Sequence, residues 1–189
     1  MQQLKRRILE DGKILLGNVI KVDGFLNHQL DIQLINEMGK EFLSRFENVK
    51  VDKILTIEAS GIAIAAISAQ YFKVPVVFAK KTEGKTTQND AYTSKVYSFT
   101  KDKTYPCFVS RQFIKEGENI LIIDDFLANG QAVLGLVDII QQAHAHCVGV
   151  GIVIEKGFQD GGKILTEHGL NLQSLVIIDS IDNATFTFR

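Results

Sequence analysis

Residues 119–143 read NILIIDDFLANGQAVLGLVDIIQQA, and this stretch decides the fold. The apolar run that ends at Ile123 is long enough for a buried parallel strand. Asp124, Asp125 and a loop over residues 126–131 follow, and apolar residues then recur every three or four positions, as on one face of a helix. The stretch therefore predicts a strand, a loop and a helix.

The predicted loop has the features of an anion site. In a parallel sheet it lies at the carboxyl end of the strand, where the first N–H groups of the helix are unpaired and carry partial positive charge. Gly130 lets the backbone approach a ligand, and the side chains of Asn129 and Gln131 can add donors. Two carboxylates beside a phosphate fit a polyol's hydroxyls or a divalent metal. The alternative is a sheet edge with two solvated aspartates.

This strand, acid pair and small-residue loop resemble the ribose-phosphate motif of the type I phosphoribosyltransferases, which use 5-phosphoribosyl-1-diphosphate (PRPP). That family usually has hydroxyl residues and a second glycine where this chain has Asn129, Gln131 and Ala132. The resemblance implies an α/β fold with a central, mainly parallel sheet flanked by helices, a small N-terminal hood and a flexible β-ribbon flap. It also implies that Asp124 and Asp125 hold the ribose hydroxyls, directly or through metal and water. The residues it assigns to the 5-phosphate are Ala128, Asn129, Gly130, Gln131 and Ala132.

Length and composition limit the class of protein. A chain of 189 residues, 46% of them hydrophobic, suits one domain with a sizeable core. Its net charge of −1 is too small to create an electrostatic field that would attract the protein to nucleic acid or to membranes. Cys107 and Cys147 lack metal-ligand spacing, which favours a reducing compartment. No apolar run approaches the roughly 20 residues of a membrane-spanning helix, and no signal-peptide core is found, so we expect a cytoplasmic protein.

The first 46 residues predict a short helix ending near Gly12, extended pieces over 14–21, and a helix that Asp31 or Asn27 can cap. The segment between Gly17 and His28 has no periodicity of its own. The resemblance, strongest to the xanthine-using bacterial members of the family, assigns residues 1–30 and a C-terminal strand region to a hood over the base. There Ile20 would cover the purine and Asn27 would hydrogen-bond it, unless Asn27 is only a helix cap.

Residues 53–78 predict a βαβ unit, with strands over Lys53–Ile57 and Val74–Phe78 and a helix over Ile62–Phe72. The turn Ala59, Ser60, Gly61 places small residues before a helix amino terminus, so it could hold a second anion. The resemblance makes this turn the diphosphate loop. Small residues in such turns also occur for packing alone.

Residues 79–104 form a long polar segment in which lysines outnumber acids, and such a segment within a compact domain is usually functional or disordered. Residues 79–86 read AKKTEGKT, one residue from a nucleotide P-loop, but Tyr92 to Phe99 favours strand where a P-loop needs a helix. We predict a flap over 80–113 with ribbon strands near 92–99 and 105–113. The resemblance implies that Lys81, beside Lys80, contacts PRPP; the alternative is a solvated hairpin face.

The remaining chain predicts a strand over Cys147–Ile154 with Gly149 and Gly151 as packing glycines, a helix near 163–168, and a last strand over 175–181. Lys156 follows the first of these strands. The resemblance implies that Lys156 meets the carbonyl oxygens of the purine and that Phe158 stacks on it. A surface lysine after a strand is the ordinary alternative.

The resemblance implies a purine-salvage transferase that moves the 5-phosphoribosyl group from PRPP to xanthine, with Mg²⁺ bound mainly through PRPP and with two copies forming a homodimer. No common spacing joins the four histidines, so no metal site made by protein ligands alone is expected. Two alternatives stay open. Guanine or hypoxanthine would be the base in a related enzyme, and a PRPP-sensing regulator would bind nucleic acid on the same fold without catalysis. The chain has no added DNA-binding domain and no basic stripe outside the flap to support the regulator.

Overall fold

The computed structural model describes residues 1–16, 19–82, 90–98, 103–182 and 185–189. Its central sheet has the strand order β10-β9-β8-β7-β3-β4, and every neighbouring pair is parallel except β10 with β9. The bounds of these strands are Lys53–Ile57 (β3), Val76–Ala79 (β4), Asn119–Leu127 (β7), His146–Lys156 (β8), Leu172–Asp182 (β9) and Thr185–Phe188 (β10). The predicted, mainly parallel sheet is confirmed.

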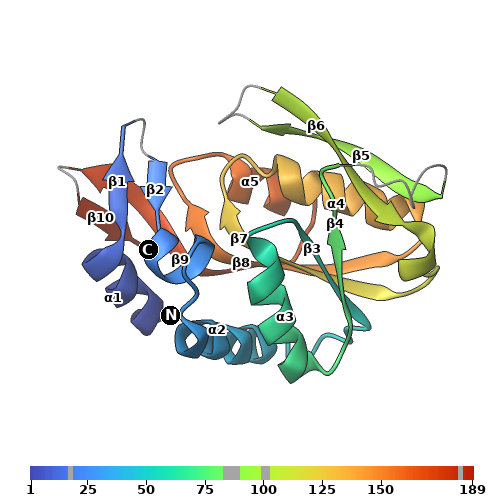
Figure 1. Ribbon diagram of the computed structural model, residues 1–189, viewed down its shortest axis with the longest axis horizontal. Helices are drawn as coiled ribbons and strands as arrows, with labels where there is room; N and C mark the ends of the chain where they lie inside the picture. Colours follow the sequence, from blue (N-terminus) through green and yellow to red (C-terminus); the bar gives the residue numbers. More distant parts are fainter. Residues whose placement is uncertain (17–18, 83–89, 99–102, 183–184) are drawn as a thin grey trace.

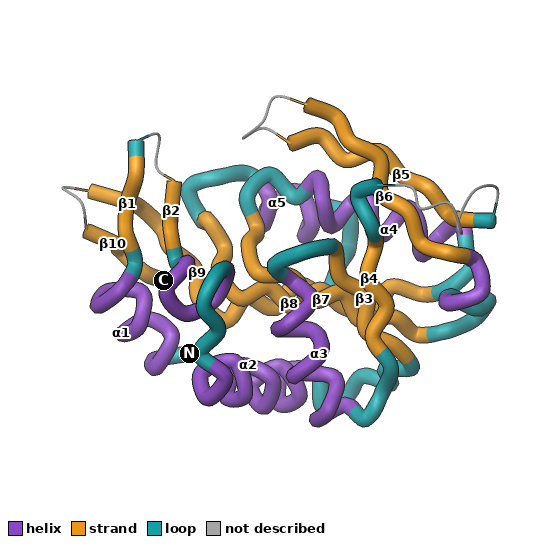
Figure 2. Tube along the Cα trace, in the orientation of Figure 1, coloured by secondary structure: helices purple, strands orange, loops and turns teal. Residues whose placement is uncertain are grey.

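Helices cover both faces of this sheet, as Figures 1 and 2 show. Helices α2 (Ile32–Arg45) and α3 (Gly61–Phe72) pack on one face, and α4 (Gln131–Gln142) and α5 (Gly161–Glu167) pack on the other. Alternate residues of β7 enter the two cores, Leu121 and Ile123 on the first face and Ile120 and Ile122 on the second. A strand buried on both sides needs a continuous apolar run, which explains the sequence before Asp124.

Two glycines of β8 make room for the aromatic side chains of α2 and the turn after it. A Cβ on Gly149 would lie 2.4 Å from the Phe46 ring, and one on Gly151 would lie 2.8 Å from the Phe42 ring. The interpretation of both as packing glycines therefore agrees with the structure. Asp31, not Asn27, caps α2, because its Oδ1 accepts a hydrogen bond from the N–H of Leu34.

Both ends of the chain lie together in the region predicted to form the hood. Helix α1 (Gln2–Asp11), the hairpin of β1 (Lys13–Leu15) and β2 (Val19–Lys21), and a π-helical turn over Asp23–Asn27 lie beside β10 in Figure 1. Lys5 Nζ donates a hydrogen bond to the backbone oxygen of Arg189 at 2.6 Å. The separate antiparallel strand β10 was not predicted from the sequence.

The predicted ribbon is present as β5 (Ala91–Ser98) and β6 (Lys103–Ser110), which pair in antiparallel fashion and lie over α4 (Figure 1). Its second strand ends at Ser110 and not at Phe113, because the chain turns there into a short 3-10 helix. Residues 83–89 and 99–102 of the predicted flap, with the second half of the P-loop-like stretch, lie outside the described residues. No helix in the described parts of the chain is long and apolar enough to cross a membrane.

Candidate active site

The predicted acid pair lies within β7, which continues beyond it to Leu127. Phe126 and Leu127 continue the strand by pairing with Ile154 and Glu155 of β8, so the predicted loop start at residue 126 was two residues too early. Asp124 is 4% exposed and Asp125 is 8% exposed. Neither carboxylate is turned out to bulk solvent.

Asp125 affects the titration of Asp124. Asp124 Oδ1 accepts a hydrogen bond from the backbone N–H of Asp125 at 3.0 Å. Burial, and then the neighbouring charge of Asp125, raise the pKa of Asp124 well above its ordinary value. No three His, Cys, Asp or Glu side chains gather as a metal site within the described residues. Two acids alone fit an ion that takes most of its ligands from a bound molecule.

The predicted phosphate loop lines a cavity of about 180 Å³. Gly130 has φ +77°, a left-handed conformation that glycine adopts without strain, and it directly precedes α4. The first N–H groups of α4 therefore open onto this cavity with no partner within the helix. All five predicted residues, 128–132, line the cavity together.

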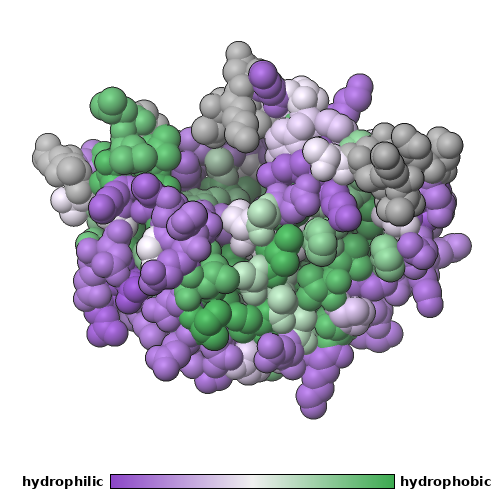
Figure 3. All heavy atoms as spheres, in the orientation of Figure 1, coloured by the Kyte–Doolittle hydropathy of each residue, from purple (hydrophilic) through white to green (hydrophobic). Residues whose placement is uncertain are grey.

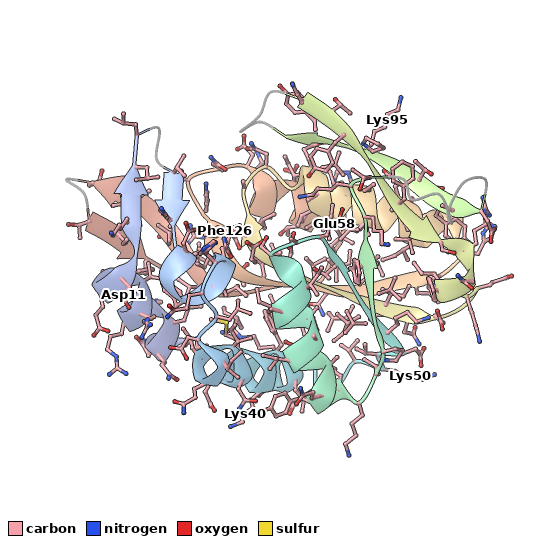
Figure 4. The ribbon with its side chains drawn as sticks, viewed as in Figure 1. Asp11, Lys40, Lys50, Glu58, Lys95 and Phe126 are labelled. Atoms are coloured by element: carbon pink, nitrogen blue, oxygen red, sulfur yellow. The ribbon has the colours of Figure 1, made fainter. Side chains whose placement is uncertain are left out.

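Lys156 lines the same cavity as the loop, although 24 residues or more separate them in the chain. Burial lowers the pKa of its ammonium group, whose Nζ lies 5.8 Å from the centre of the Phe126 ring. Sequence reasoning missed Phe126 as a cavity residue; an aromatic residue directly after the acid pair was the signal available. Figure 4 shows Phe126 beside the hood and Glu58 above α3, both at the same edge of the sheet.

The predicted diphosphate turn approaches the acid pair from the next strand. A Cβ on Gly61 would lie 2.1 Å from Thr56 Oγ1 and 2.8 Å from Asp124 Oδ1, so only glycine fits at this position. Parallel pairing of β3 with β7 brings the ends of these two strands together. The structure thus places Gly61 close to Asp124, and all three residues of the turn lie outside the lining of the 180 Å³ cavity.

The predicted flap lysines take different positions. Lys80 pairs with Phe108 in a β-bridge, which ties the ribbon to the end of β4. The N–H of Lys81 donates to Glu58 Oε1 at 2.6 Å, and its Nζ lies 5.2 Å from the ring centre of Tyr105, a residue that lines the cavity. Lys81 is also near enough to Asp124 to oppose the rise in its pKa. Neither lysine lines the cavity itself.

The other residues predicted to contact the purine base lie farther from the cavity than Lys156 does. Ile20 is 7% exposed and belongs to the same apolar cluster against which Phe158 and Phe126 pack. Asn27 is exposed at the end of the π-helical turn. None of Ile20, Asn27 and Phe158 lines the cavity that holds Lys156. Their roles toward a base stay predictions.

Known proteins resemble this chain along its whole length. Xanthine phosphoribosyltransferase of Ruminiclostridium cellulolyticum is 56% identical over 188 residues and covers 100% of this chain and 99% of its own. The xanthine phosphoribosyltransferase of Clostridioides difficile is 57% identical over 190 residues, with 100% of both chains covered.

Solved structures agree in fold. Adenine phosphoribosyltransferase from Leishmania tarentolae superposes with a TM-score of 0.76 at 15% identity, covering 96% of this chain and 90% of that one. The Rhodothermus marinus enzyme of the same name gives 0.75 at 18% identity, covering 94% of this chain and 100% of that one. The phosphoribosyl transferase domain family matches residues 21–163, and this chain belongs to that family.

Proposed function

We propose that this protein transfers the 5-phosphoribosyl group of PRPP to xanthine, releasing xanthosine 5-phosphate and diphosphate. Relatives 55% and 59% identical over the full chain carry the name xanthine phosphoribosyltransferase, which supports the choice of base. The observation that carries the proposal is that the 128–132 loop and Lys156 line the same cavity. This cavity offers an anion site for the phosphate of PRPP and a cation for the base, close enough together for both substrates to bind side by side.

PRPP binds by its two phosphoryl ends in this proposal. The N–H groups of residues 128–132 at the start of α4 hold the 5-phosphate, because a helix amino terminus attracts an anion. The turn of Ala59, Ser60 and Gly61, with Lys80 and Lys81, holds the diphosphate. The ribbon of β5 and β6 closes over this end and excludes water from the reacting centre.

Asp124 and Asp125 lie under the ribose. Their burial side by side supports a site that gains a partner when substrate arrives, because two unpaired buried carboxylates are costly otherwise. Mg²⁺ bound with PRPP would neutralise the leaving diphosphate, and the two acids would reach it directly or through water. As the bond between C1 and the diphosphate loosens, the ring becomes positive and the carboxylates stabilise it. The purine nitrogen then forms the new bond to C1 from the opposite face.

Lys156 binds the base. Burial lowers the pKa of its ammonium group, so the group gains from a partner with carbonyl oxygens or negative charge. Xanthine is acidic and offers such oxygens. Phe158 stacks on the purine, Ile20 covers it and Asn27 hydrogen-bonds it when the hood closes.

Two copies form a homodimer, in the cytoplasm, where the two cysteines, free in this structure, remain reduced. Helix α3 is apolar on both sides, yet Ala66 is exposed and Ile62 and Ile67 are only half-buried. Figure 3 shows hydrophobic residues gathered over α3 and β4, where Phe78 is 38% exposed. A helix of this kind is usually covered on every side, which supports a second copy there.

The test is an assay of diphosphate release from PRPP and Mg²⁺ with xanthine, guanine, hypoxanthine and adenine as separate acceptors. We expect the highest kcat/KM with xanthine. Xanthine as the poorest purine would refute the choice of base. Binding of PRPP with no diphosphate released by any base would refute the transferase itself.

A further inference from the structure

Gln159 lies in the turn between β8 and α5 and lines the cavity together with Lys156 and the 128–132 loop. Its backbone N–H donates to the carbonyl oxygen of Lys156 at 2.9 Å. Two residues later, the N–H of Gly161 donates to the carbonyl oxygen of Ala128, also at 2.9 Å. The backbone of Gln159 is therefore anchored between the lysine on one side and the loop on the other.

The side-chain oxygen of Gln159 is not satisfied by the part of the chain that the structure describes. Its Oε1 is buried and has no hydrogen-bond partner among the described residues. A buried polar oxygen without a partner destabilises a fold, so one that persists beside an open cavity points to a ligand that supplies the missing hydrogen bond.

The chemistry of Oε1 selects between the two substrates. An amide oxygen only accepts hydrogen bonds, and a phosphate at neutral pH offers acceptors alone. A purine such as xanthine presents N–H groups next to carbonyl oxygens. The ammonium of Lys156 only donates, so it can serve a carbonyl oxygen but not an N–H. The cavity thus needs an acceptor beside Lys156, and Gln159 provides one.

We infer that Gln159 contacts the base and helps to determine specificity, with Oε1 accepting a hydrogen bond from a purine N–H while Lys156 holds a nearby carbonyl oxygen. The inference rests on the proposed function, since it takes xanthine as the acceptor substrate. The competing role for Gln159 is a contact from its Nε2 to the 5-phosphate, and the experiment separates the two.

Gln159→Met keeps the length of the side chain and removes the amide, whereas Gln159→Glu keeps an acceptor at the same position. Gln141→Met, at an exposed position of α4 outside the cavity, is the matched control. KM is measured for xanthine at saturating PRPP and for PRPP at saturating xanthine. We expect Gln159→Met to raise the KM for xanthine about tenfold to a hundredfold, because a buried hydrogen bond is lost. The KM for PRPP should stay within about twofold, and Gln159→Glu should recover part of the loss.

A rise in the KM for PRPP alone would assign Gln159 to the phosphate and overturn the inference, as would wild-type values for both substrates. If Gln159→Met does not fold, xanthine analogues with one N–H replaced by C–H, apart from the reacting nitrogen, test the wild-type protein. The KM for at least one analogue should exceed that for xanthine by about the same factor. Equal affinity for xanthine and all of the analogues would also overturn the inference. A wild-type protein that ignores xanthine would instead refute the proposed function.

Discussion

The two ends of strands β3 and β7 both bury charged side chains, but they pair them differently. At the amino end, Lys53 Nζ donates to the two carboxylate oxygens of Glu118 at 2.6 and 2.8 Å and to the carbonyl oxygen of Phe113 at 2.6 Å. At the carboxyl end, Asp124 and Asp125 lie side by side, and neither forms an ion pair within the described residues. At the amino end the opposite charge lies in contact within the protein, whereas at the carboxyl end no described cation forms an ion pair with the acids.

The difference separates charges that hold the fold from charges that serve a ligand. Removing one partner of a buried pair leaves an uncompensated charge, so the pair at Lys53 is needed for stability. Two like charges kept close together cost stability and persist where a bound molecule or ion uses them. Mutations at the amino end should therefore lower the stability of the fold, and mutations at the carboxyl end should lower the activity.

The largest effect on stability is expected at the paired end. Lys53→Met leaves Glu118 without its cation and should cost about 3–5 kcal/mol of unfolding free energy, or roughly 6–20 °C in Tm. Thermal melting measures it, and kcat/KM well below the Tm should match the wild type. The double variant Lys53→Met/Glu118→Leu should recover much of the loss. If folded Lys53→Met lost activity as well, the amino end would not differ from the carboxyl end in serving the fold alone.

At the carboxyl end we expect a large effect on activity and a small effect on stability. Asp125→Asn should lower kcat by about a hundredfold to a thousandfold, because a charge that stabilises the transition state is lost. Its Tm should change little, because no ion pair is broken. Asp138→Asn, at an exposed position of α4, is the control. Parallel losses of melting temperature and activity in Asp125→Asn would show that the acid pair is structural.

Lys156 extends the comparison to a cation at the same end of the sheet. Lys156→Ala should raise the KM for xanthine about tenfold to a hundredfold and leave the KM for PRPP nearly unchanged, because a charged hydrogen bond to the base is lost. Steady-state kinetics with each substrate varied in turn measures this. Lys163→Ala on α5, where the side chain is 74% exposed, should behave as the wild type. A larger rise in the KM for PRPP than in the KM for xanthine would show that Lys156 does not bind the base.

The smallest effect is a pH dependence of stability. The raised pKa of Asp124 means that the folded protein holds this proton more tightly than the unfolded chain. Its contribution to stability is therefore present below the ordinary pKa and is lost as the pH rises through the folded-state pKa. Asp124→Asn lacks this loss, so its Tm relative to the wild type should increase as the pH rises above about 4, the ordinary pKa of an aspartate. A constant difference across this range would mean that Asp124 titrates normally.

Local sequence pattern predicted most of the elements and the core of the site. The apolar run before Asp124 and the small residues around Gly130 gave the strand, loop and helix, and pairing with β8 moved the loop start by only two residues. The pattern could not show that Phe126, Tyr105 and Gln159 line one cavity, because they come from three segments. Nor did it give β10, whose four residues pair with the end of β9 in antiparallel fashion.

By itself, then, the sequence determined which segments are strands or helices and which loop can receive a phosphate, because side-chain spacing and glycine conformation act over a few neighbouring residues. Only the tertiary structure decided which charges are paired. Lys53 meets Glu118 across 65 positions, whereas Asp124 meets Gly61 and another acid, and both outcomes follow from the register of β3 against β7. Register depends on packing across the whole sheet, and a local pattern does not contain it.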